Sequence, residues 1–515
     1  MTSDSDLAAA LARTRQSYDD TPYVHAPMMR SHPGRLAAQA LWRGLAVPDA
    51  SRARVLEIGC ASGGNLLPLA AMMPEARFLG VDLSPKQIEA GEARRRRFGL
   101  ANVALRADSF EALGAADGLF DFIICHGVYS WIPEPLRDSL MRVTRERLAP
   151  DGLAMVSFNV LPGWRLFQIA RDSMLLNARM IDPAERAQKT RALFGLLAAQ
   201  SVNKNTYGKF WRDEARHMAA GGDAYLAHEI FEDANAPETF ADFTARAARF
   251  DLGYLGEAVA VANNEADLAP DGAETIRALS GGDRLKRETY IDIFSGRSFR
   301  EAVLVHRGRE AVLAPEPPPE ALRSLHFIPA LDLECAPAPD GVRLAVKDLD
   351  LTFHDGAAEP GLRRLIARKP GSSRLADLGA DGDAEPLGEA LRIAVETGLL
   401  AVSTLPVVCA NRLAERPKLW PFAAGEAGDG EHTVTRRHSA FQFAPLQRLL
   451  APLIDGTRTR DDLVAAALDL AARGALTVGG PEGPVTDPDA WRRPVERGVD
   501  NALAGLLRNG LLVEG

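Results

Sequence analysis

A glycine-rich turn between two apolar runs is the segment best suited to hold a ligand. Glu57–Gly64 reads EIGCASGG, and the apolar run that follows it along the chain ends at Asp82. Glycines allow the backbone to approach a ligand closely, and an acid at the end of a strand lies where open α/β sheets bind ligands. A further acid, Asp108, ends the next apolar run. We therefore expect a bound ligand at this turn.

The spacing of the glycines separates three kinds of ligand. A dinucleotide fingerprint, G-x-G-x-x-G, would place Ala61 at its second glycine, which is a weak match. A phosphate-binding loop would need a lysine after Gly64, where Asn65 stands. An acid, Glu57, precedes the glycines, and an acid does not neutralise a phosphate. The pattern favours a nucleoside that carries positive charge.

Aromatic residues cluster after another apolar run, in the segment HGVYSWIP. It contains His126, Tyr129 and Trp131, which could form the wall of a substrate channel because aromatic rings exclude water and hold a cation by the π face. The alternative is an ordinary aromatic plug beneath a loop. His126 could accept a proton, although a lone histidine at a strand end is more often a hydrogen-bonded structural residue.

Strand and helix signals alternate from residue 53 to about 160, which is typical of a parallel sheet with crossover helices. Apolar runs predict strands at 54–59, 77–83, 103–108, 120–127 and 152–160. Helical periodicity predicts helices over 64–73, 85–98 and 134–148, the second of which starts at Ser84-Pro85. Strand-like runs return at 252–261 and 299–307, and together these runs predict a seven-stranded sheet with a helical insertion before its last two strands.

The remainder of the chain follows a proline-rich segment, APEPPPEA, which marks a domain boundary. A weak internal repeat relates residues 362–402 to 446–515, and each copy resembles a winged-helix unit. Neither copy has a basic recognition helix, so we expect modules that contact protein or regulate rather than modules that read DNA.

Composition excludes several classes of protein. The 515 residues are 46% hydrophobic and 25% charged, which is an ordinary globular composition. The formal net charge of −9 argues against binding of nucleic acid, which usually requires a basic domain. The run Arg94–Arg97 falls late in a predicted helix and is expected to be a solvated helix end. There is no apolar run of ~18 residues, so no membrane insertion is expected, and the acidic N-terminal segment does not resemble a secretory signal. We expect a cytoplasmic protein.

The sequence offers little for metal chemistry. The four cysteines lie far apart without CxxC pairing, which argues against a zinc site and against a disulfide framework. In a second cluster, which starts at His228, one histidine and three acids have the spacing of a helix and could form half of a metal site. The sequence shows no further residues that would complete such a site. We therefore expect an exposed acidic helix face and no metal at the residues His228, Glu229, Glu232 and Asp233.

Longer stretches of the sequence resemble a known family. The segments SYDDTPYVHAPMMRSHPGRLAAQAL, LEIGCASGGNLLPLA, HGVYSWIP, LPGW and YLAHEIFED together resemble the bacterial protein lysine methyltransferases of the rickettsial outer-membrane-protein type, with their methyltransferase regulatory domain. The resemblance covers roughly residues 15–310 and is weaker beyond them. It implies a Rossmann-like class I methyltransferase fold and S-adenosylmethionine as the cofactor.

The resemblance also implies roles for particular residues. Asp82 is similar to the acid that accepts hydrogen bonds from both ribose hydroxyls, and Asp108 to the acid beside the adenine amino group. The sequence matches the first motif of class I methyltransferases, except that Ala61 replaces the middle glycine. Tyr18 and Tyr23 of the N-terminal segment could close over the cofactor. The expected cofactor-binding residues are Glu57, Gly59, Ala61, Gly63, Asp82, Leu83, Asp108, Ser109, His126, Tyr18 and Tyr23.

Other roles remain open for three of these residues. Asp82 could instead cap the helix that begins at Pro85, and Asp108 with Ser109 could be a solvent-facing cap. Glu57 could orient the amides of the loop or could contact the methionine ammonium group.

The expected reaction is methyl transfer from S-adenosylmethionine to lysine side chains of a protein, with Tyr129, Trp131 and His126 as the catalytic residues. Lysine has a free pKa of ~10.4, so the site must strip solvent and remove a proton before the amine can react. The alternatives are a small-molecule N- or O-methyltransferase and a non-enzymatic protein that responds to S-adenosylmethionine. A homodimer is possible.

We expect five segments along the chain. They are an N-terminal helical segment with the cofactor-binding core (1–160), a helical insertion for substrate binding, regulation or dimerisation (161–250), returning strands that complete the core (251–311), a winged-helix-like domain (320–405) and a second helical or winged-helix-like domain (406–515).

Overall fold

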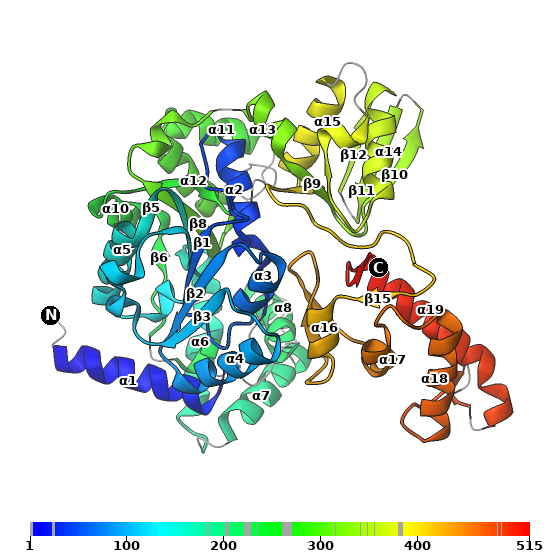
Figure 1. The fold of residues 1–515 in the computed structure, drawn as a ribbon. Coiled ribbons are helices and arrows are strands. Elements are labelled where there is room, and N and C mark those ends of the chain that lie inside the picture. Colours follow the sequence, from blue (N-terminus) through cyan, green and yellow to red (C-terminus); the bar gives the residue numbers. More distant parts are fainter. Residues whose placement is uncertain are drawn as a thin grey trace.

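Figure 1 shows an α/β core with two further parts of the chain on one side of it, and the α/β fold class predicted from the sequence is confirmed. The computed structural model describes residues 4–22, 26–182, 185–200, 205–220, 228–232, 234–259, 270–314, 316–339, 341–347, 349–354, 356–379, 385–480, 483–485 and 487–514.

The core is built on one mixed sheet. Seven strands follow the order β3-β2-β1-β4-β5-β8-β7, and β6 pairs with β5 outside this path. The strands β1 to β5 are parallel, whereas β8 is antiparallel to both β5 and β7. All seven predicted strands are present, and the two-residue β6 is an addition too short to give a sequence signal. The strands are β1 (Arg54–Ile58), β2 (Arg77–Asp82), β3 (Val103–Ala107), β4 (Phe120–Cys125), β5 (Leu148–Leu161), β6 (Glu238–Thr239), β7 (Leu252–Glu257) and β8 (Phe299–His306).

Alternate residues of each strand pack on opposite faces of the sheet. Val55 belongs to an apolar cluster with residues of α2 (Pro33–Trp42) and α3 (Leu66–Met72), whereas Leu56 belongs to a cluster with residues of α5 (Glu134–Arg147) and α10 (Phe240–Arg249). Because both faces are covered, the strands are apolar along their length. The carboxyl ends of the parallel strands therefore meet at one edge, where ligands bind in this class of sheet.

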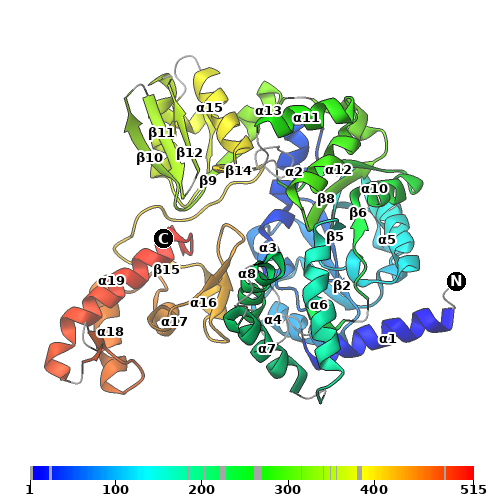
Figure 2. The same cartoon turned by 180° about the vertical axis from the view of Figure 1, so that it is seen from behind.

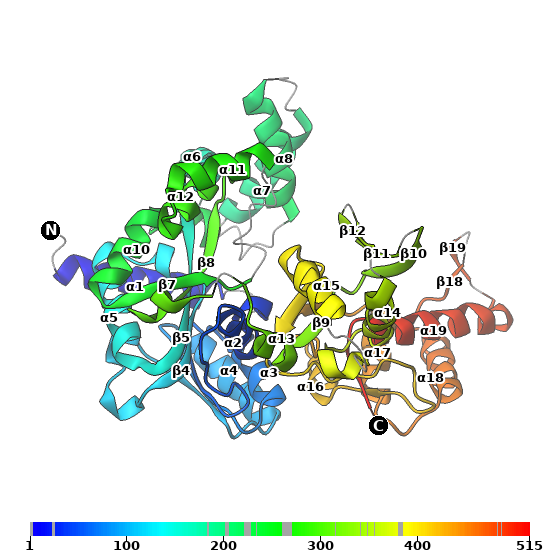
Figure 3. The ribbon, with the colours of Figure 1, turned by 90° about the horizontal axis from the view of Figure 1, so that it is seen from above.

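Helices fill the insertion that the sequence predicts between β5 and the returning strands. α6 (Trp164–Ala178), α7 (Arg186–Gln200) and α8 (Thr206–Ala220) extend away from the sheet (Figures 2 and 3). They share a small apolar cluster that contains Phe194 and Trp211. After this insertion, α11 (Pro270–Ser280) and α12 (Arg284–Ser295) lie in the connection from β7 to β8.

Residues 319–403 form a smaller α/β unit, whose apolar cluster also includes Ala38 and Trp42 of α2. The antiparallel sheet β10-β11-β12 was not predicted, because its short strands combine charged residues, proline and glycine and give little alternation. The elements are α13 (Pro319–Ser324), β9 (His326–Pro329), β10 (Glu334–Ala338), β11 (Gly341–Val346), β12 (Leu349–Phe353), α14 (Glu359–Ala367), β13 (Ser373–Arg374), α15 (Glu385–Glu396) and β14 (Leu400–Ser403).

The C-terminal part combines helices with short antiparallel strands. The strand near its beginning, β15, pairs with β20 at the end of the chain, so the two ends of this part are joined. Its elements are β15 (Lys418–Leu419), α16 (Pro421–Glu426), β16 (His432–Val434), β17 (Ala440–Gln442), α17 (Pro445–Leu450), α18 (Arg460–Ala472), β18 (Gly479–Gly480), β19 (Gly483–Pro484), α19 (Arg492–Arg508) and β20 (Leu512–Val513).

The C-terminal part packs directly on the core at the end of α4 (Pro85–Arg97). The rings of Phe98 and Phe422 stack with centroids 4.2 Å apart. Beside them Arg94 forms an ion pair with Glu426, and Arg97 forms one with Asp429. The prediction of a simply solvated helix end at Arg94–Arg97 is therefore wrong for two of its four residues. The apolar cluster on this face of the sheet continues into the C-terminal part, so the proline-rich segment does not isolate the tail.

Within the ranges that the structure describes, no helix is both long enough and apolar enough to cross a membrane.

Candidate functional site

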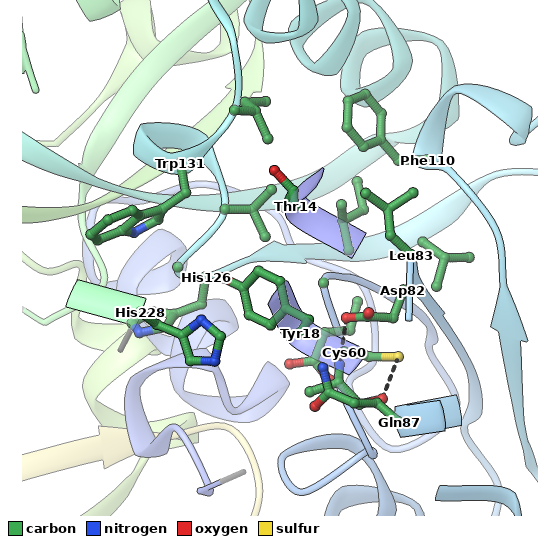
Figure 4. Close-up of a pocket in the computed structure, with 18 of the residues that line it drawn as sticks. Thr14, Tyr18, Cys60, Asp82, Leu83, Gln87, Phe110, His126, Trp131 and His228 are labelled. Atoms are coloured by element: carbon green, nitrogen blue, oxygen red, sulfur yellow. Dashed lines mark hydrogen bonds between the residues drawn. The ribbon is translucent and has the colours of Figure 1, made fainter. Parts of the chain in front are cut away.

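A cavity of about 410 Å³ opens at the carboxyl ends of the parallel strands, between the loops after β1, β2, β3 and β4 and the N-terminal helix α1 (Asp4–Asp20). Figure 4 shows how side chains from these elements point into it. The structure brings together most of the residues predicted from the sequence. Those that line the cavity are Tyr18, Glu57, Gly59, Ala61, Asp82, Leu83, Asp108, Ser109, His126 and Trp131.

The loop after β1 has the backbone that close approach to a ligand requires. Gly59 has a φ of +75°, and a Cβ on it would lie 2.4 Å from Val128 Cγ2, so a larger residue would be strained and would have to displace Val128. Ala61 has a φ of 48°, in the left-handed region that favours glycine, and keeps the position usually given to glycine at a cost of about 1–2 kcal/mol. Gly63 shapes the turn with a φ of +72° and does not line the cavity.

Asp82 ends β2 and faces the cavity from its rim. Its carboxylate accepts hydrogen bonds from the backbone N–H of Ala61 (2.8 Å) and of Ser84 (2.9 Å). Burial raises the pKa of Asp82 even though both bonds favour the ionised form. The role of helix cap belongs to Ser84, whose hydroxyl accepts from Gln87 N, so Asp82 is not needed for that role. Its carboxylate can therefore accept hydroxyl donors of a ligand.

Glu57 lies at the bottom of the cavity and is 5% exposed. Its Oε1 accepts a hydrogen bond of 2.8 Å from Asn65 Nδ2, whereas its buried Oε2 has no partner among the described residues. Burial, with a contribution from the nearby Asp82, raises the pKa of Glu57 to about 8. A buried carboxyl with one unsatisfied oxygen is a fitting partner for a cationic group of a ligand.

Asn65 connects this carboxyl to distant parts of the chain. It lines the cavity, and its Oδ1 accepts from the backbone N–H of Met28 (2.8 Å) and lies 2.8 Å from Nε2 of His438 in the C-terminal part. Burial holds the pKa of His438 well below its usual range, so the ring is neutral and donates this hydrogen bond. The sequence identified Asn65 only as a residue that replaces the lysine of a phosphate loop, and its contact across about 370 residues has no local signal.

Asp108 and Ser109 lie at the end of the cavity beyond Asp82. Asp108 Oδ1 accepts from the backbone N–H of Ser109 (2.9 Å), and the Ser109 hydroxyl accepts from the backbone N–H of Glu111 (3.2 Å). The two residues therefore act as local caps. They line the cavity as well, so the capping role and the ligand-binding role are compatible.

Aromatic side chains line the opposite end of the cavity. Trp131, His126 and His228 lie close to one another there (Figure 4), and Phe299 contacts the His126 ring with centroids 5.7 Å apart. Burial and the nearby Arg30 lower the pKa of His126 to about 4, so this ring is neutral at physiological pH. A base that weak does not efficiently take a proton from an ammonium group, but a neutral ring can shape and dry a channel.

Tyr129 does not belong to this wall, and the prediction that it does is wrong. Its side chain is fully buried between Phe158 and Phe243, and its hydroxyl donates to Glu238 Oε2 (2.6 Å). Within the short helical turn Tyr129–Trp131, only the last residue points into the cavity. Tyr129 is thus the aromatic plug that the sequence left as an alternative. His126, Tyr129 and Trp131, two to five positions apart, were assigned one role because the turn geometry cannot be read from their spacing.

The N-terminal helix is held over the cavity by the segment 228–232. Tyr18 stacks on His228 with centroids 4.3 Å apart, and Ser17 Oγ donates to Glu232 Oε1 (2.6 Å). His228 also contacts Glu232 Oε1 (3.0 Å) and the carbonyl oxygen of Thr21 (2.6 Å). The prediction of an exposed acidic helix face is therefore wrong, since His228 is 2% and Glu232 7% exposed. Tyr23 and Asp233 lie outside the described residues.

Several residues that line the cavity were not expected there from the sequence. Glu229 lines the cavity next to His228, and burial raises its pKa to about 7. Leu11 and Thr14 of α1, Gln87 of α4 and Asn159 of β5 also line the cavity. They come from helix and strand positions whose orientation depends on the tertiary packing.

The charge of the cavity selects its ligand. Its described lining contains carboxyl groups and neutral side chains but no lysine or arginine. The arrangement therefore suits a ligand with a cationic end near Glu57 and hydroxyl groups near Asp82, and it does not suit a phosphate. This is the set of groups that a nucleoside with a sulfonium and an ammonium group offers.

Comparisons with known proteins agree with this geometry. Three family models match the chain: a methyltransferase domain at residues 55–152, a predicted methyltransferase regulatory domain at 222–306 and a PKMT, C-terminal winged helix domain at 415–511. The regulatory domain spans the end of the predicted insertion and both returning strands.

Two uncharacterized proteins of Rickettsia prowazekii are similar in sequence. One is 33% identical over 291 residues, which are 56% of this chain and 52% of that protein, and the other is 34% identical over 235 residues, which are 45% of this chain and 94% of that protein. This chain thus matches about half the length of the first relative and nearly all of the second.

A solved structure is similar over the whole chain. PKMT2 from Rickettsia typhi in complex with AdoHcy is 25% identical, with a TM-score of 0.83 over 96% of this chain and 100% of that chain. With the methyltransferase family model and the fit of the cavity, this identifies the cofactor as S-adenosylmethionine. The resemblance found in the sequence is confirmed. The chain belongs to the class I S-adenosylmethionine-dependent methyltransferases that carry a methyltransferase regulatory domain and a PKMT-type C-terminal winged helix.

Proposed function

We propose that this enzyme methylates the Nζ atom of lysine side chains in a protein substrate. The observation that carries the proposal is the aromatic and acidic end of the cavity, where Trp131, His126 and His228 gather beside Glu229. Aromatic rings and a carboxyl group suit an amine that arrives as a cation.

For this reaction the protein must align the lysine amine with the cofactor and remove a proton from that amine. When bound, S-adenosylmethionine supplies a methyl group on a positively charged sulfur. The lysine amine must present its lone pair along the S–CH₃ bond, and a channel wall such as the Trp131 ring supports this by excluding water and restricting orientation.

Glu229 is suited to receive the amine's proton. Burial raises the pKa of its carboxyl to about 7, so both protonation states are populated near neutral pH. A group in this range is more effective at proton transfer than His126, whose pKa is lowered to about 4. Desolvation of the lysine ammonium lowers the amine's own pKa and so reduces the difference that the transfer must overcome.

A small-molecule O-methyltransferase is the second candidate. Trans-aconitate 2-methyltransferase from Methylobacterium nodulans is 32% identical to this chain over 208 residues, which are 40% of this chain and 74% of that protein. A carboxylate acceptor, however, would meet carboxyl groups in this cavity and no cationic side chain among the described lining residues. The electrostatics therefore favour an amine acceptor.

A protein acceptor is favoured over a free amine by the likeness to PKMT2 and by the match to the PKMT winged helix domain. We place the reaction in the cytoplasm, which the four free cysteines support because free thiols persist in a reducing compartment. The acidic pI of about 5.7 supports a protein rather than a nucleic-acid partner. A homodimer is supported by exposed apolar side chains on and just after α6, namely Leu166, Leu176 and Met180.

The proposal is tested by incubating the purified chain with methyl-labelled S-adenosylmethionine and a bacterial lysate. We expect label on discrete protein bands, and methyl-lysine on peptide mass spectrometry of those bands. Label confined to small molecules would instead support the second candidate, and absence of any transfer would contradict both.

A variant tests the proposed proton acceptor separately from the proposed substrate. Glu229→Gln keeps the size of the side chain but cannot take a proton, so it should lower the rate of lysine methylation without abolishing cofactor binding. If Glu229→Gln labels the same bands at an unchanged rate across pH 6 to pH 9, the assigned proton acceptor is wrong, although the lysine substrate would stand.

A further inference from the structure

A second cavity lies where the core meets both C-terminal parts. Its volume is about 250 Å³, and its lining comes from α2, from the turn after α3, from the segment around β14 and from the turn after β16. It is distinct from the cofactor cavity, whose lining residues it does not share. Neither the methyltransferase reaction nor the family models assign it a role.

Three arginines line this second cavity. Arg35 comes from α2 in the core, whereas Arg436 and Arg437 come from the turn between β16 and β17 of the C-terminal part. Arg35 is 7% exposed, and its Nη2 has no hydrogen-bond partner in the described part of the chain. Arg35 is part of the cavity lining.

The other two arginines are held by carbonyl oxygens and not by acids. Arg437 is 8% exposed and donates to the carbonyl oxygens of Pro370 and Pro329, both at 2.7 Å. Arg436 Nε donates to the carbonyl oxygen of Val408 at 3.0 Å, and its guanidinium lies over the Trp420 ring. These contacts fix the direction of the side chains but leave their charge uncompensated.

Other titratable groups that face the cavity do not balance this charge. Glu75 lies on the rim, 64% exposed, and its carboxylate forms an ion pair of 2.8 Å with Arg52. Burial lowers the pKa of His32 to about 3 and raises that of the nearby Cys409 thiol to about 11, so both are neutral. Burial and the neighbouring Arg437 lower the pKa of Arg35 to about 9, at which it is still charged at neutral pH.

The same chain neutralises a buried arginine elsewhere. Arg300, 1% exposed, forms ion pairs with Glu257 (2.6 Å), Glu288 (3.1 Å) and Asp292 (2.8 Å). A buried ion without a partner costs several kcal/mol. Among the described residues, the lining of the interface cavity thus has the donors of an ion-pair network without a carboxylate paired to them.

We propose that this cavity binds a small metabolite through a phosphate or carboxylate group held by Arg35, Arg436 and Arg437. Guanidinium groups bind such oxyanions with charge-assisted, often bidentate hydrogen bonds. The cavity is below the roughly 300–1,000 Å³ of sites for drug-sized ligands, so the ligand is small. Because the arginines come from two parts of the chain, the bound anion would hold the C-terminal part on the core.

Calorimetric titration of the full chain tests the proposal, with inorganic phosphate and succinate as separate probes at constant ionic strength in a chloride buffer. We expect saturable binding of at least one probe, and the preferred probe distinguishes a phosphate-bearing from a carboxylate-bearing ligand. Arg35→Met and Arg436→Met should each weaken binding at least tenfold.

Arg97→Met is the matched control, because Arg97 lies at the same interface but outside the cavity and already pairs with Asp429. It should bind the probe as the wild type does. Thermal melting without the probe checks the fold: Arg35→Met removes an unpaired buried charge, so its melting temperature should equal or exceed that of the wild type. No saturable binding of either probe, binding that survives both cavity substitutions, or early melting of Arg35→Met would each overturn the proposal.

Discussion

The cofactor cavity and the interface cavity contain buried ionisable groups of opposite sign, and they differ in how those groups can be tolerated without a ligand. Glu57 in the cofactor cavity has a pKa raised to about 8, so it becomes neutral by holding a proton. The arginines of the interface cavity remain charged at neutral pH. Without the cofactor, the carboxyl group in the acidic cavity can therefore be neutral. The arginines of the basic cavity stay charged and need water or an anion beside them.

The two cavities also differ in their relation to the reaction and to the packing of the parts of the chain. The acidic cavity lies within the core and faces the reacting groups, and the basic cavity lies between parts of the chain. Changes to the first should alter affinity and turnover, and changes to the second should alter docking. The four predictions below test the cofactor cavity and the contacts that support it, starting with the largest effect, whereas the titrations of the arginine variants test the interface cavity.

Asp82→Ala should weaken binding of S-adenosylmethionine by about 2–4 kcal/mol, which is roughly 30- to 1000-fold in the dissociation constant, because hydrogen bonds to a charged acceptor are lost. Calorimetric titration measures the change. Asp108→Ala is the comparison, and its effect should be smaller since that side chain is 40% exposed. Unchanged affinity of a folded Asp82→Ala variant would remove the assignment.

Trp131→Ala should lower turnover ~10- to 1000-fold and leave cofactor affinity within about threefold, because a channel wall acts on alignment of the acceptor. Tyr129→Phe is the matched control. It removes the hydrogen bond to Glu238 outside the cavity, so it should lower the free energy of unfolding by about 1–3 kcal/mol while turnover stays near that of the wild type. Proportional loss of stability, cofactor binding and turnover in Trp131→Ala would make it a packing residue.

Affinity for S-adenosylmethionine should rise with pH, by up to about tenfold per unit between about pH 6 and pH 8, because the cationic cofactor binds the ionised form of Glu57. The folded-state pKa of about 8 exceeds the ordinary value of 4.5, so the cofactor-free protein loses stability as pH rises through this window. The cofactor should therefore raise the melting temperature more at pH 8 than at pH 6. Glu57→Gln should flatten both trends; the same slope in that variant would assign the proton to another group.

His438→Ala should weaken cofactor binding by about three- to tenfold, since it removes the hydrogen bond that holds Asn65 beside Glu57, a loss of roughly 1 kcal/mol. Arg97→Met, which breaks an ion pair of the same interface away from Asn65, should leave affinity unchanged. Titration and melting of both variants compare the two. Equal losses of affinity would mean that docking as a whole, and not this hydrogen bond, supports the site.

The sequence predicted the core well because strand periodicity and the glycine-rich turn are local signals. The seven long strands were predicted for this reason, and Glu57, Asp82 and Asp108, which lie at or near the strand ends, line one cavity. Tyr129 was misplaced because a single helical turn sends neighbouring aromatic residues in different directions.

Longer-range features could not be read from the sequence. The hydrogen bond from His438 to Asn65, the stacking of Tyr18 on His228 and the pairing of Arg94 with Glu426 join residues far apart in the chain. Each depends on how separately folded parts pack, and no periodicity or motif encodes such packing.

The position of α1 has a kinetic consequence. Tyr18 lines the cofactor cavity and rests on His228, and Ser17 is held by Glu232, so the helix over the cofactor is fastened to the segment that contains His228 and Glu232. Exchange of cofactor past this helix requires its contacts to open, which include the hydrogen bond from the Ser84 hydroxyl to Asp19 as well. The lifetime of these few contacts therefore contributes to the cofactor's dissociation rate. The regulatory domain can in this way set the pace of the catalytic cycle without touching the reacting atoms.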